Sequence, residues 1–84
     1  MANLELFYFD SCPFCQHVLM VISQLDLKVT LSDIMNSIEK RSQLINDTGR
    51  KTVPCLYIDG RPMFESQDII KWLKDNENNL EKNA

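Results

Sequence analysis

Apolar residues in the first third of the chain form three short segments, each with a different spacing. Residues 4–9 are almost continuously apolar, which is typical of a central strand covered on both faces. From Phe14 onward, apolar residues recur at the spacing of one helical face, so a helix follows this strand directly. Residues 28–32 then alternate between polar and apolar, as a half-exposed strand does. Together these segments predict a βαβ unit.

A second helix is predicted in the middle of the chain. Asn36 and Glu39 approximate a capping box at its start, and Gly49 stands where a left-handed residue ends a helix. The apolar positions of this helix are Met35, Ile38, Leu44 and Ile45. We expect this helix to be about ten residues long.

The last third of the chain predicts a hairpin and a final helix. Asp59-Gly60, between the apolar runs 53–58 and 61–64, is a strong signal for a two-residue hairpin loop. Pro62 favours an edge position for the second arm, and Ser66 is expected to cap the last helix. Residues 76–84 are polar and are expected to form a frayed tail. The predicted order is βαβαββα, in a single domain over residues 1–84.

Composition supports this interpretation and excludes several classes of partner. The chain has 84 residues, of which 44% are hydrophobic and 25% charged, values typical of one packed domain. Its net charge of −3 repels phosphate backbones and anionic lipid, so we expect neither a nucleic-acid nor a membrane partner. No basic segment precedes the first apolar run, and no apolar stretch approaches the roughly 18 residues that span a bilayer. We therefore expect a cytoplasmic protein.

The strongest chemical signal is the sequence Cys12-Pro13-Phe14-Cys15. Cys12 lies where the first strand meets the first helix, and Pro13 takes the first-turn position that proline favours. Backbone N–H groups and the positive end of the helix dipole there favour the thiolate, so Cys12 is the predicted nucleophile. Cys15 lies one turn further on the same face, close enough to form a disulfide with Cys12 or donate to its thiolate.

Other interpretations of the cysteines remain open. Cys12 and Cys15 could be small core residues or half of a zinc site, although a zinc ribbon needs a second Cys-x-x-Cys motif. Cys55 is interpreted as a buried strand residue, with a regulatory thiol as the alternative. A site combining the cysteines with His17 has no recognisable ligand spacing, so we expect no metal.

A second motif, Thr52-Val53-Pro54, leads to a family. Combined with Cys-Pro-Phe-Cys and with the hairpin sequence Tyr-Ile-Asp-Gly, it resembles the glutaredoxins over residues 4–73. The usual glutaredoxin motif is Cys-Pro-Tyr-Cys, so Phe14 keeps the ring and removes a hydroxyl. The resemblance implies an α/β, thioredoxin-like fold, with a four-stranded mixed sheet flanked by three helices.

The same resemblance implies an enzyme, a glutathione-dependent thiol–disulfide oxidoreductase. Cys12 would attack protein disulfides or glutathione mixed disulfides, and Cys15 would be the resolving thiol. Glutathione would be the reductant and co-substrate, with glutathione reductase acting indirectly. The implied partners are disulfide-containing or glutathionylated proteins, and the expected state is a monomer.

The resemblance also implies where glutathione binds. A cis Pro54 would pack beside the cysteines, and the Val53 backbone would pair with the cysteinyl part of glutathione, flanked by Phe14 and Thr52. Arg41, next to Lys40 on the second helix, is expected to meet the glycyl carboxylate, with a solvated helix face as the alternative.

The γ-glutamyl end of that site departs from the family pattern. Glutaredoxins usually carry Gly-Gly before the last helix, whereas this chain has Glu65-Ser66. This pair resembles the Glu-Ser of glutathione transferases, which binds the γ-glutamyl group. A helix N-terminus is a general anion site, although Ser66 could also be a plain cap.

Two further functions remain as alternatives. The first is a glutaredoxin-like electron donor reduced by thioredoxin reductase, and the missing Gly-Gly gives it some support. The second is an iron–sulfur cluster carrier, against which Pro13 argues because proline stiffens and crowds the loop. A glutathione transferase is not expected, because its helical second domain does not fit within 84 residues.

Overall fold

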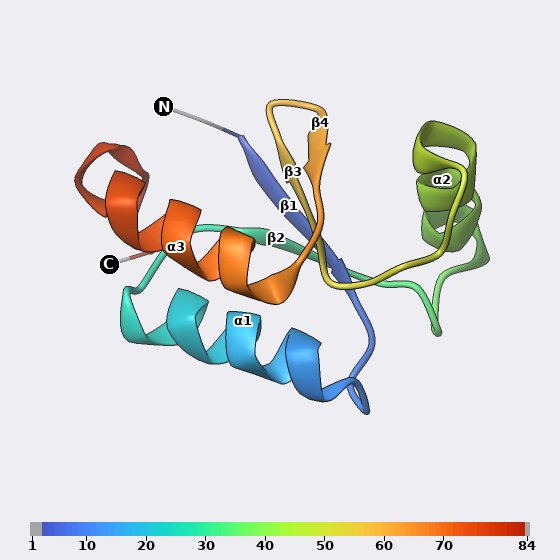
Figure 1. The fold of residues 1–84 in the computed structure, drawn as a ribbon, viewed down its shortest axis with the longest axis horizontal. Coiled ribbons are helices and arrows are strands. Elements are labelled where there is room, and N and C mark those ends of the chain that lie inside the picture. The colour runs from blue at the N-terminus through green and yellow to red at the C-terminus, as the bar shows by residue number, and fades with distance from the viewer. Residues whose placement is uncertain (1–2, 84) are drawn as a thin grey trace.

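The computed structural model describes residues 3–83 and confirms the predicted order of elements (Figure 1). The elements are β1 (Leu4–Tyr8), α1 (Pro13–Gln24), β2 (Thr30–Asp33), α2 (Ile38–Thr48), β3 (Cys55–Ile58), β4 (Arg61–Met63) and α3 (Ser66–Asn76), followed by a short 3-10 turn (Glu77–Asn79).

The four strands form one mixed sheet in the order β2-β1-β3-β4. β1 runs parallel to β2 and antiparallel to β3, with Tyr8 opposite Asp33 and Phe7 opposite Cys55. The expected thioredoxin-like architecture is therefore confirmed. β4 is an edge strand, as Pro62 predicts, because proline cannot donate a ladder hydrogen bond.

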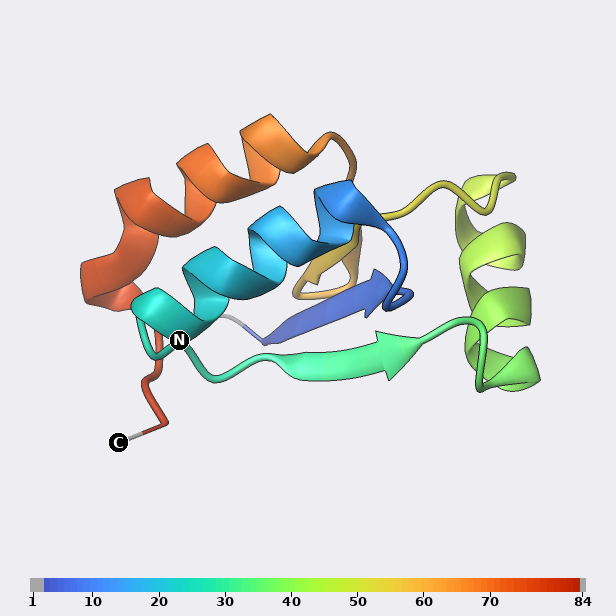
Figure 2. The same ribbon diagram turned by 90° about the horizontal axis from the view of Figure 1, so that it is seen from below.

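Apolar side chains of β1 alternate between two cores, one on each face of the sheet. Helices α1 and α3 lie side by side on one face, where Leu6 packs with Val18 and Ile69 (Figures 1 and 2). On the other face, Phe7 packs with Leu44 of α2. A strand covered on both sides explains why residues 4–9 are almost continuously apolar.

The prediction of which apolar residues of α2 face the core is wrong for most of them. Of the four predicted positions only Leu44 is buried, whereas Met35, Ile38 and Ile45 are exposed. The helix instead turns mainly polar side chains toward the sheet, spaced three or four residues apart around Leu44. The predicted cap is also wrong by one residue, because Ser37 rather than Asn36 accepts from the Lys40 N–H at 3.2 Å. Gly49 ends the helix with φ 79°, as predicted.

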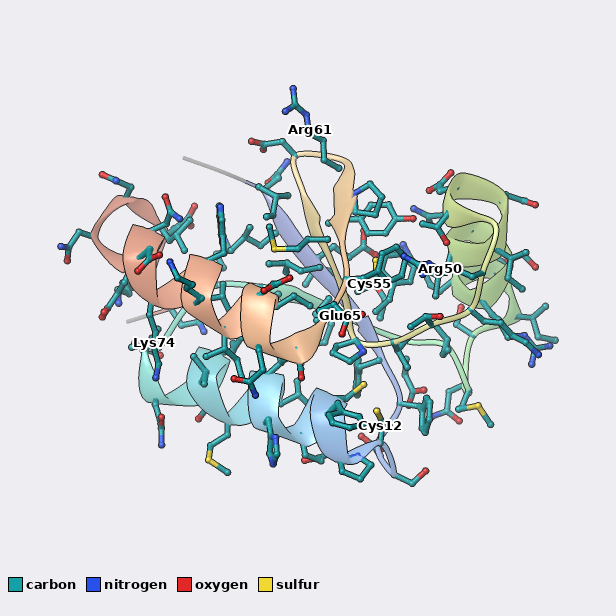
Figure 3. All side chains as sticks on the ribbon, in the orientation of Figure 1. Cys12, Arg50, Cys55, Arg61, Glu65 and Lys74 are labelled. Atoms are coloured by element: carbon teal, nitrogen blue, oxygen red, sulfur yellow. The ribbon has the colours of Figure 1, made fainter. Side chains whose placement is uncertain are left out.

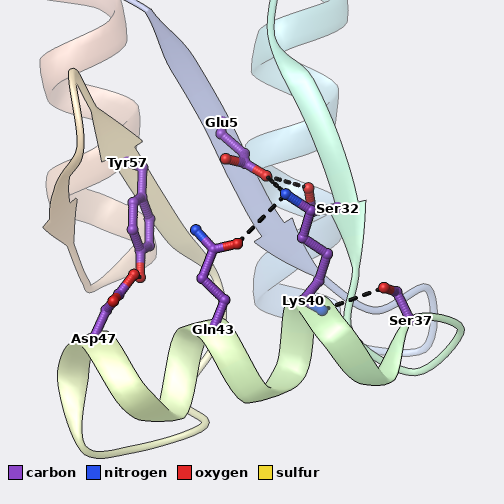
Figure 4. Close-up of polar contacts among 7 residues, drawn as sticks. All are labelled: Glu5, Ser32, Ser37, Lys40, Gln43, Asp47 and Tyr57. Carbon is purple, nitrogen blue, oxygen red and sulfur yellow. Dashed lines mark hydrogen bonds and ion pairs between the residues drawn. The ribbon is translucent and has the colours of Figure 1, made fainter.

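A polar network joins α2 to the sheet (Figure 4). Lys40 Nζ and Ser32 Oγ both donate to Glu5 Oε2, at 2.8 and 2.5 Å. The Tyr57 hydroxyl donates to Asp47 Oδ2 at 2.9 Å. A cavity of about 560 Å³ opens beside these side chains, and none of the predicted site residues lines it.

The segment after α3 is packed, whereas the sequence led us to expect it to be frayed. Leu80 is buried in the core of α1 and α3. The Lys28 N–H donates to the Glu81 carbonyl at 2.9 Å, and Lys82 Nζ donates to the Leu25 carbonyl at 2.7 Å. Ala84, the end of the expected tail, lies outside the described residues. None of the helices described is long and apolar enough to cross a membrane.

Candidate active site

Cys12 lies at the junction that the sequence predicts. It is the N-cap of α1, with Pro13 as the first helical residue, and its Sγ accepts from the Cys15 N–H at 3.4 Å. This places the sulfur at the positive end of the helix dipole. Within the loop before it, the Gln16 side chain donates to the Asp10 carbonyl at 2.7 Å, which ties the loop to the helix.

Cys15 differs from Cys12 although both are free thiols on the same turn. It is fully buried, and this burial, with a smaller effect from its hydrogen bond with Cys12, raises the pKa of Cys15 to about 12. Cys15 therefore stays protonated at neutral pH and can donate a proton toward Cys12. The adjacency of the two sulfur-bearing residues, predicted from their spacing, is confirmed.

A cleft of about 400 Å³ opens beside this junction. It is lined by Phe14, Thr52, Val53, Pro54, Glu65, Ser66 and Gln67, which come from α1, the segment before β3 and the start of α3. The Val53–Pro54 peptide bond is cis, as the resemblance implies. All but one of the residues predicted to bind glutathione therefore line a single cleft. Gln67 was missed, and nothing in its sequence context distinguishes it from an ordinary helical residue.

The start of α3 differs in detail from the prediction. Glu65, not Ser66, holds the N-cap position, and no side chain caps the helix. Ser66 is the first helical residue and is buried against the cleft. Glu65 has φ 72°, a conformation that glycine adopts far more readily than other residues. The chain thus keeps, with a glutamate, a backbone conformation suited to the glycine that the family pattern has in this segment.

The basic residues near the site lie differently from the prediction. Arg41 is exposed on α2 and does not line the cleft, while its neighbour Lys40 is paired with Glu5. Arg50, which sequence reasoning missed, holds its guanidinium 3.9 Å from the centroid of the Phe64 ring. Figure 3 shows Arg50 between α2 and the segment that carries Glu65. Its position just before Thr52 was the signal that could have identified it.

Cys55 is fully buried, as predicted, in the core cluster that also contains Phe7 and Tyr57. Burial raises the pKa of the Cys55 thiol to about 12, which leaves it an unreactive neutral group at physiological pH. Residues 3–83 contain no group of three or more His, Cys, Asp or Glu side chains that could hold a metal ion.

This chain is similar to known proteins in both sequence and fold. A family model, "Glutathione S-transferase, N-terminal domain", matches residues 6–81. The chain belongs to this family. The sequence led us to set glutathione transferases aside on length, yet this match shows that the chain is related to their N-terminal domain.

The chain is also similar to glutaredoxins. Glutaredoxin 3 of Escherichia coli is 29% identical over 69 residues, covering 82% of this chain and 83% of that protein. A wheat glutaredoxin structure has 25% identity and a TM-score of 0.74, covering 96% of this chain and 84% of the other. An epsilon-class glutathione S-transferase from housefly shares the fold, with 21% identity, a TM-score of 0.75 and coverage of 89% and 35%. The predicted glutaredoxin type is confirmed, and with it membership of a thiol–disulfide oxidoreductase family.

Proposed function

We propose that this chain is a glutathione-dependent dithiol oxidoreductase that reduces protein disulfides and glutathione mixed disulfides. The observation that carries the proposal is the cleft, in which three separate segments bring the predicted glutathione-binding residues together next to the N-terminus of α1. Small-molecule binding sites are typically preformed clefts of this kind.

The cysteinyl and γ-glutamyl parts of glutathione each have a matching group in this cleft. The backbone before the cis Val53–Pro54 bond offers Val53 for pairing with the cysteinyl unit. The uncapped N-terminus of α3, at Ser66 and Gln67, suits the γ-glutamyl carboxylate, and the Glu65 carboxylate suits the γ-glutamyl ammonium. Phe14 and Thr52 close the sides of the cleft. Arg41 lies outside it, so we assign the glycyl carboxylate no fixed partner.

The reaction consists of two thiol–disulfide exchanges. The Cys12 thiolate attacks the glutathione sulfur of a mixed disulfide, forms a disulfide with glutathione, and releases the substrate thiolate, which takes up a proton. A second glutathione thiolate then attacks the glutathione sulfur, releasing glutathione disulfide and the Cys12 thiolate. With a protein disulfide, the Cys12 thiolate attacks one sulfur and the other leaves as a thiolate, which takes up a proton. Cys15 then gives up its proton and attacks the Cys12 sulfur, which releases the reduced protein and leaves a Cys12–Cys15 disulfide. Two glutathiones reduce this disulfide and leave as glutathione disulfide. We propose that a reducing, cytoplasmic setting and a monomeric state accompany this activity.

The experiment that tests this proposal follows NADPH consumption through glutathione reductase and glutathione, with a glutathionylated peptide as substrate. We expect Cys12→Ser to abolish turnover and Cys15→Ser to retain it, because the mixed disulfide needs a single nucleophile. Cys15→Ser should lose activity on a protein disulfide. If the unmodified protein gave no turnover, glutathione dependence would be rejected, and thioredoxin reductase would be tested next as the electron source.

A further inference from the structure

Two large apolar side chains that the sequence pattern assigns to the core are exposed where the chain passes from β2 into α2. Met35 is 67% exposed and Ile38 is 75% exposed. Neither lines the cleft proposed for glutathione. Single exposed apolar residues are common on protein surfaces, so their position relative to the nucleophile decides whether they matter.

Strand register places these residues at the edge of the sheet that carries Cys12. β1 and β2 are parallel, Tyr8 lies opposite Asp33, and the Ile34 N–H donates to the Tyr8 carbonyl at 2.9 Å. The segments that leave the two strands, 9–12 and 34–37, therefore emerge at the same edge, as Figure 2 shows. Their first apolar residues, Phe9 and Ile34, pack in the same core cluster.

The order of the strands separates this pair from the cleft. β1 lies between β2 and β3, so the loop after β1 has the Met35 segment on one side and the cis Val53–Pro54 bond on the other. Cys12 is at the end of that loop. A disulfide attacked by Cys12 can thus have one half in the cleft and the other half over Met35 and Ile38.

Three acidic residues lie in the segments that carry or adjoin the two apolar residues. Asp10 is exposed in the Cys12 loop, Glu39 is exposed next to Ile38, and Asp33 binds the Met35 N–H at 2.9 Å. Lys40 and Arg41 follow on α2. Lys40 pairs with Glu5 at 2.8 Å, so Arg41 is the one that offsets part of this charge. The surface is therefore apolar with a net negative rim, which complements a polypeptide carrying apolar and basic side chains.

We propose that Met35 and Ile38 form a docking surface for the protein half of the substrate. They bind an apolar side chain next to the reactive cysteine of the substrate, and the acidic rim favours a neighbouring Lys or Arg. This inference rests on Cys12 acting as the nucleophile, as in the proposed function, and it adds the class of polypeptide that the enzyme prefers.

A single-turnover reaction without glutathione tests the surface directly. Two cysteine peptides, one flanked by Leu and Lys and one by Ser and Glu, are converted to mixed disulfides with 5-thio-2-nitrobenzoate. In a Cys15→Ser background, the Cys12 thiolate attacks the peptide sulfur, a Cys12–peptide disulfide forms, and the coloured thiolate leaves. Its absorbance gives the second-order rate constant, and the stable product is confirmed by mass.

We expect the Leu/Lys peptide to react faster than the Ser/Glu peptide. The double substitution Met35→Ser and Ile38→Ser should slow the Leu/Lys peptide about tenfold, the loss expected when two partly covered apolar side chains are removed. It should leave the Ser/Glu peptide within about twofold. Ile45→Ser is the matched control, because Ile45 is also exposed, two turns further along α2. It should change neither rate.

Equal slowing of both peptides, no slowing, or an equal effect of Ile45→Ser would each overturn the docking surface. The Met35 and Ile38 side chains are exposed, so the double variant should keep its thermal midpoint, and a large drop would also count against the assignment. Failure of the glutathione-coupled assay alongside the expected peptide dependence would reject glutathione dependence alone. The two proposals can therefore fail separately.

Discussion

Two cysteines one helical turn apart have different chemistry because their surroundings differ. Cys12 caps α1 and its sulfur accepts from the Cys15 N–H, while the Cys15 side chain is fully buried. Burial keeps Cys15 protonated at neutral pH, and the proposed mechanism therefore uses Cys12 as the nucleophile. Cys55, although adjacent to Pro54, is as deeply buried as Cys15 and takes no part.

The buried Cys55 thiol predicts a pH dependence of stability. Burial raises its pKa from 9.0 to about 12, so above pH 9 the unfolded chain releases a proton that the folded protein retains. The stabilisation is complete below pH 9 and is lost as the pH rises toward 12. Because Tyr57 and Cys15 share this trend, the comparison needs a variant.

Cys55→Ala isolates the contribution of Cys55. We expect it to cost about 1 kcal/mol near pH 7, through the small cavity left behind, and progressively less above pH 9. Urea unfolding in the presence of a reductant at pH 7 and pH 10 measures both values. A difference between the two proteins that stayed constant with pH would show that this thiol does not titrate as described.

Glu65 is a second residue whose conformation makes a testable contribution to stability. Its φ of 72° is costly for a residue with a side chain, whereas glycine adopts it freely. We expect Glu65→Gly to raise the free energy of unfolding by about 1 kcal/mol. The same substitution should weaken glutathione binding, since the carboxylate for the γ-glutamyl ammonium is lost.

Stability and binding should therefore move in opposite directions in Glu65→Gly. Chemical denaturation gives the first quantity and the Michaelis constant for glutathione gives the second. Glu65→Ala is the control, because it removes the carboxylate but still places a residue with a side chain at a positive φ. If both variants had the same stability, the backbone at position 65 would carry no measurable strain.

At the scale of elements, α2 differs from the other two helices. α1 and α3 bury apolar faces against each other and the sheet, whereas α2 contacts the sheet through one buried leucine and a polar network. The Lys40–Glu5 pair is partly exposed, so its net contribution is modest. Most of the attachment of α2 should therefore come from Leu44.

Leu44→Ala should lower the free energy of unfolding by about 2–4 kcal/mol, because the side chain is fully buried against Phe7 and its neighbours. Ile45→Ala, one residue further on the exposed side of the helix, should change it by less than about 0.5 kcal/mol. Urea unfolding of both variants measures the difference. A loss for Ile45→Ala as large as for Leu44→Ala would mean that the helix is rotated from the position described.

At the scale of the whole molecule, the segment after α3 holds the far end of α1 in place. Leu80 fills the core between α1 and α3, and the backbone of residues 81–83 bonds to residues 26–28. In a chain of 84 residues such a closure matters, because small domains bury little apolar surface.

Leu80→Ala should therefore cost about 2–3 kcal/mol and lower the thermal midpoint by roughly 4–8 °C per kcal/mol. Glu81→Ala breaks the exposed pair with Lys28 and should leave the midpoint nearly unchanged. Differential scanning calorimetry compares the two variants. Equal midpoints would place Leu80 outside the folded core.

The sequence by itself determined the order of elements, the hairpin, the edge strand and the position of Cys12, because each depends on neighbouring residues. Strand period, proline geometry and helix termini are local properties. The Thr52–Pro54 motif and Glu65-Ser66 were also identified from their residues, but their meeting in one cleft is a fact of the fold.

Tertiary structure decided which apolar residues are buried and which polar side chains of α2 face the sheet. Helical spacing predicted an apolar face from Met35 to Ile45, yet the sheet opposite α2 presents Glu5 and Ser32, so polar partners turned inward and Ile38 turned outward. The tail is packed because α1 and α3 leave a space that Leu80 fills. These outcomes depend on contacts between residues far apart in the chain, so the local spacing of apolar residues cannot predict them.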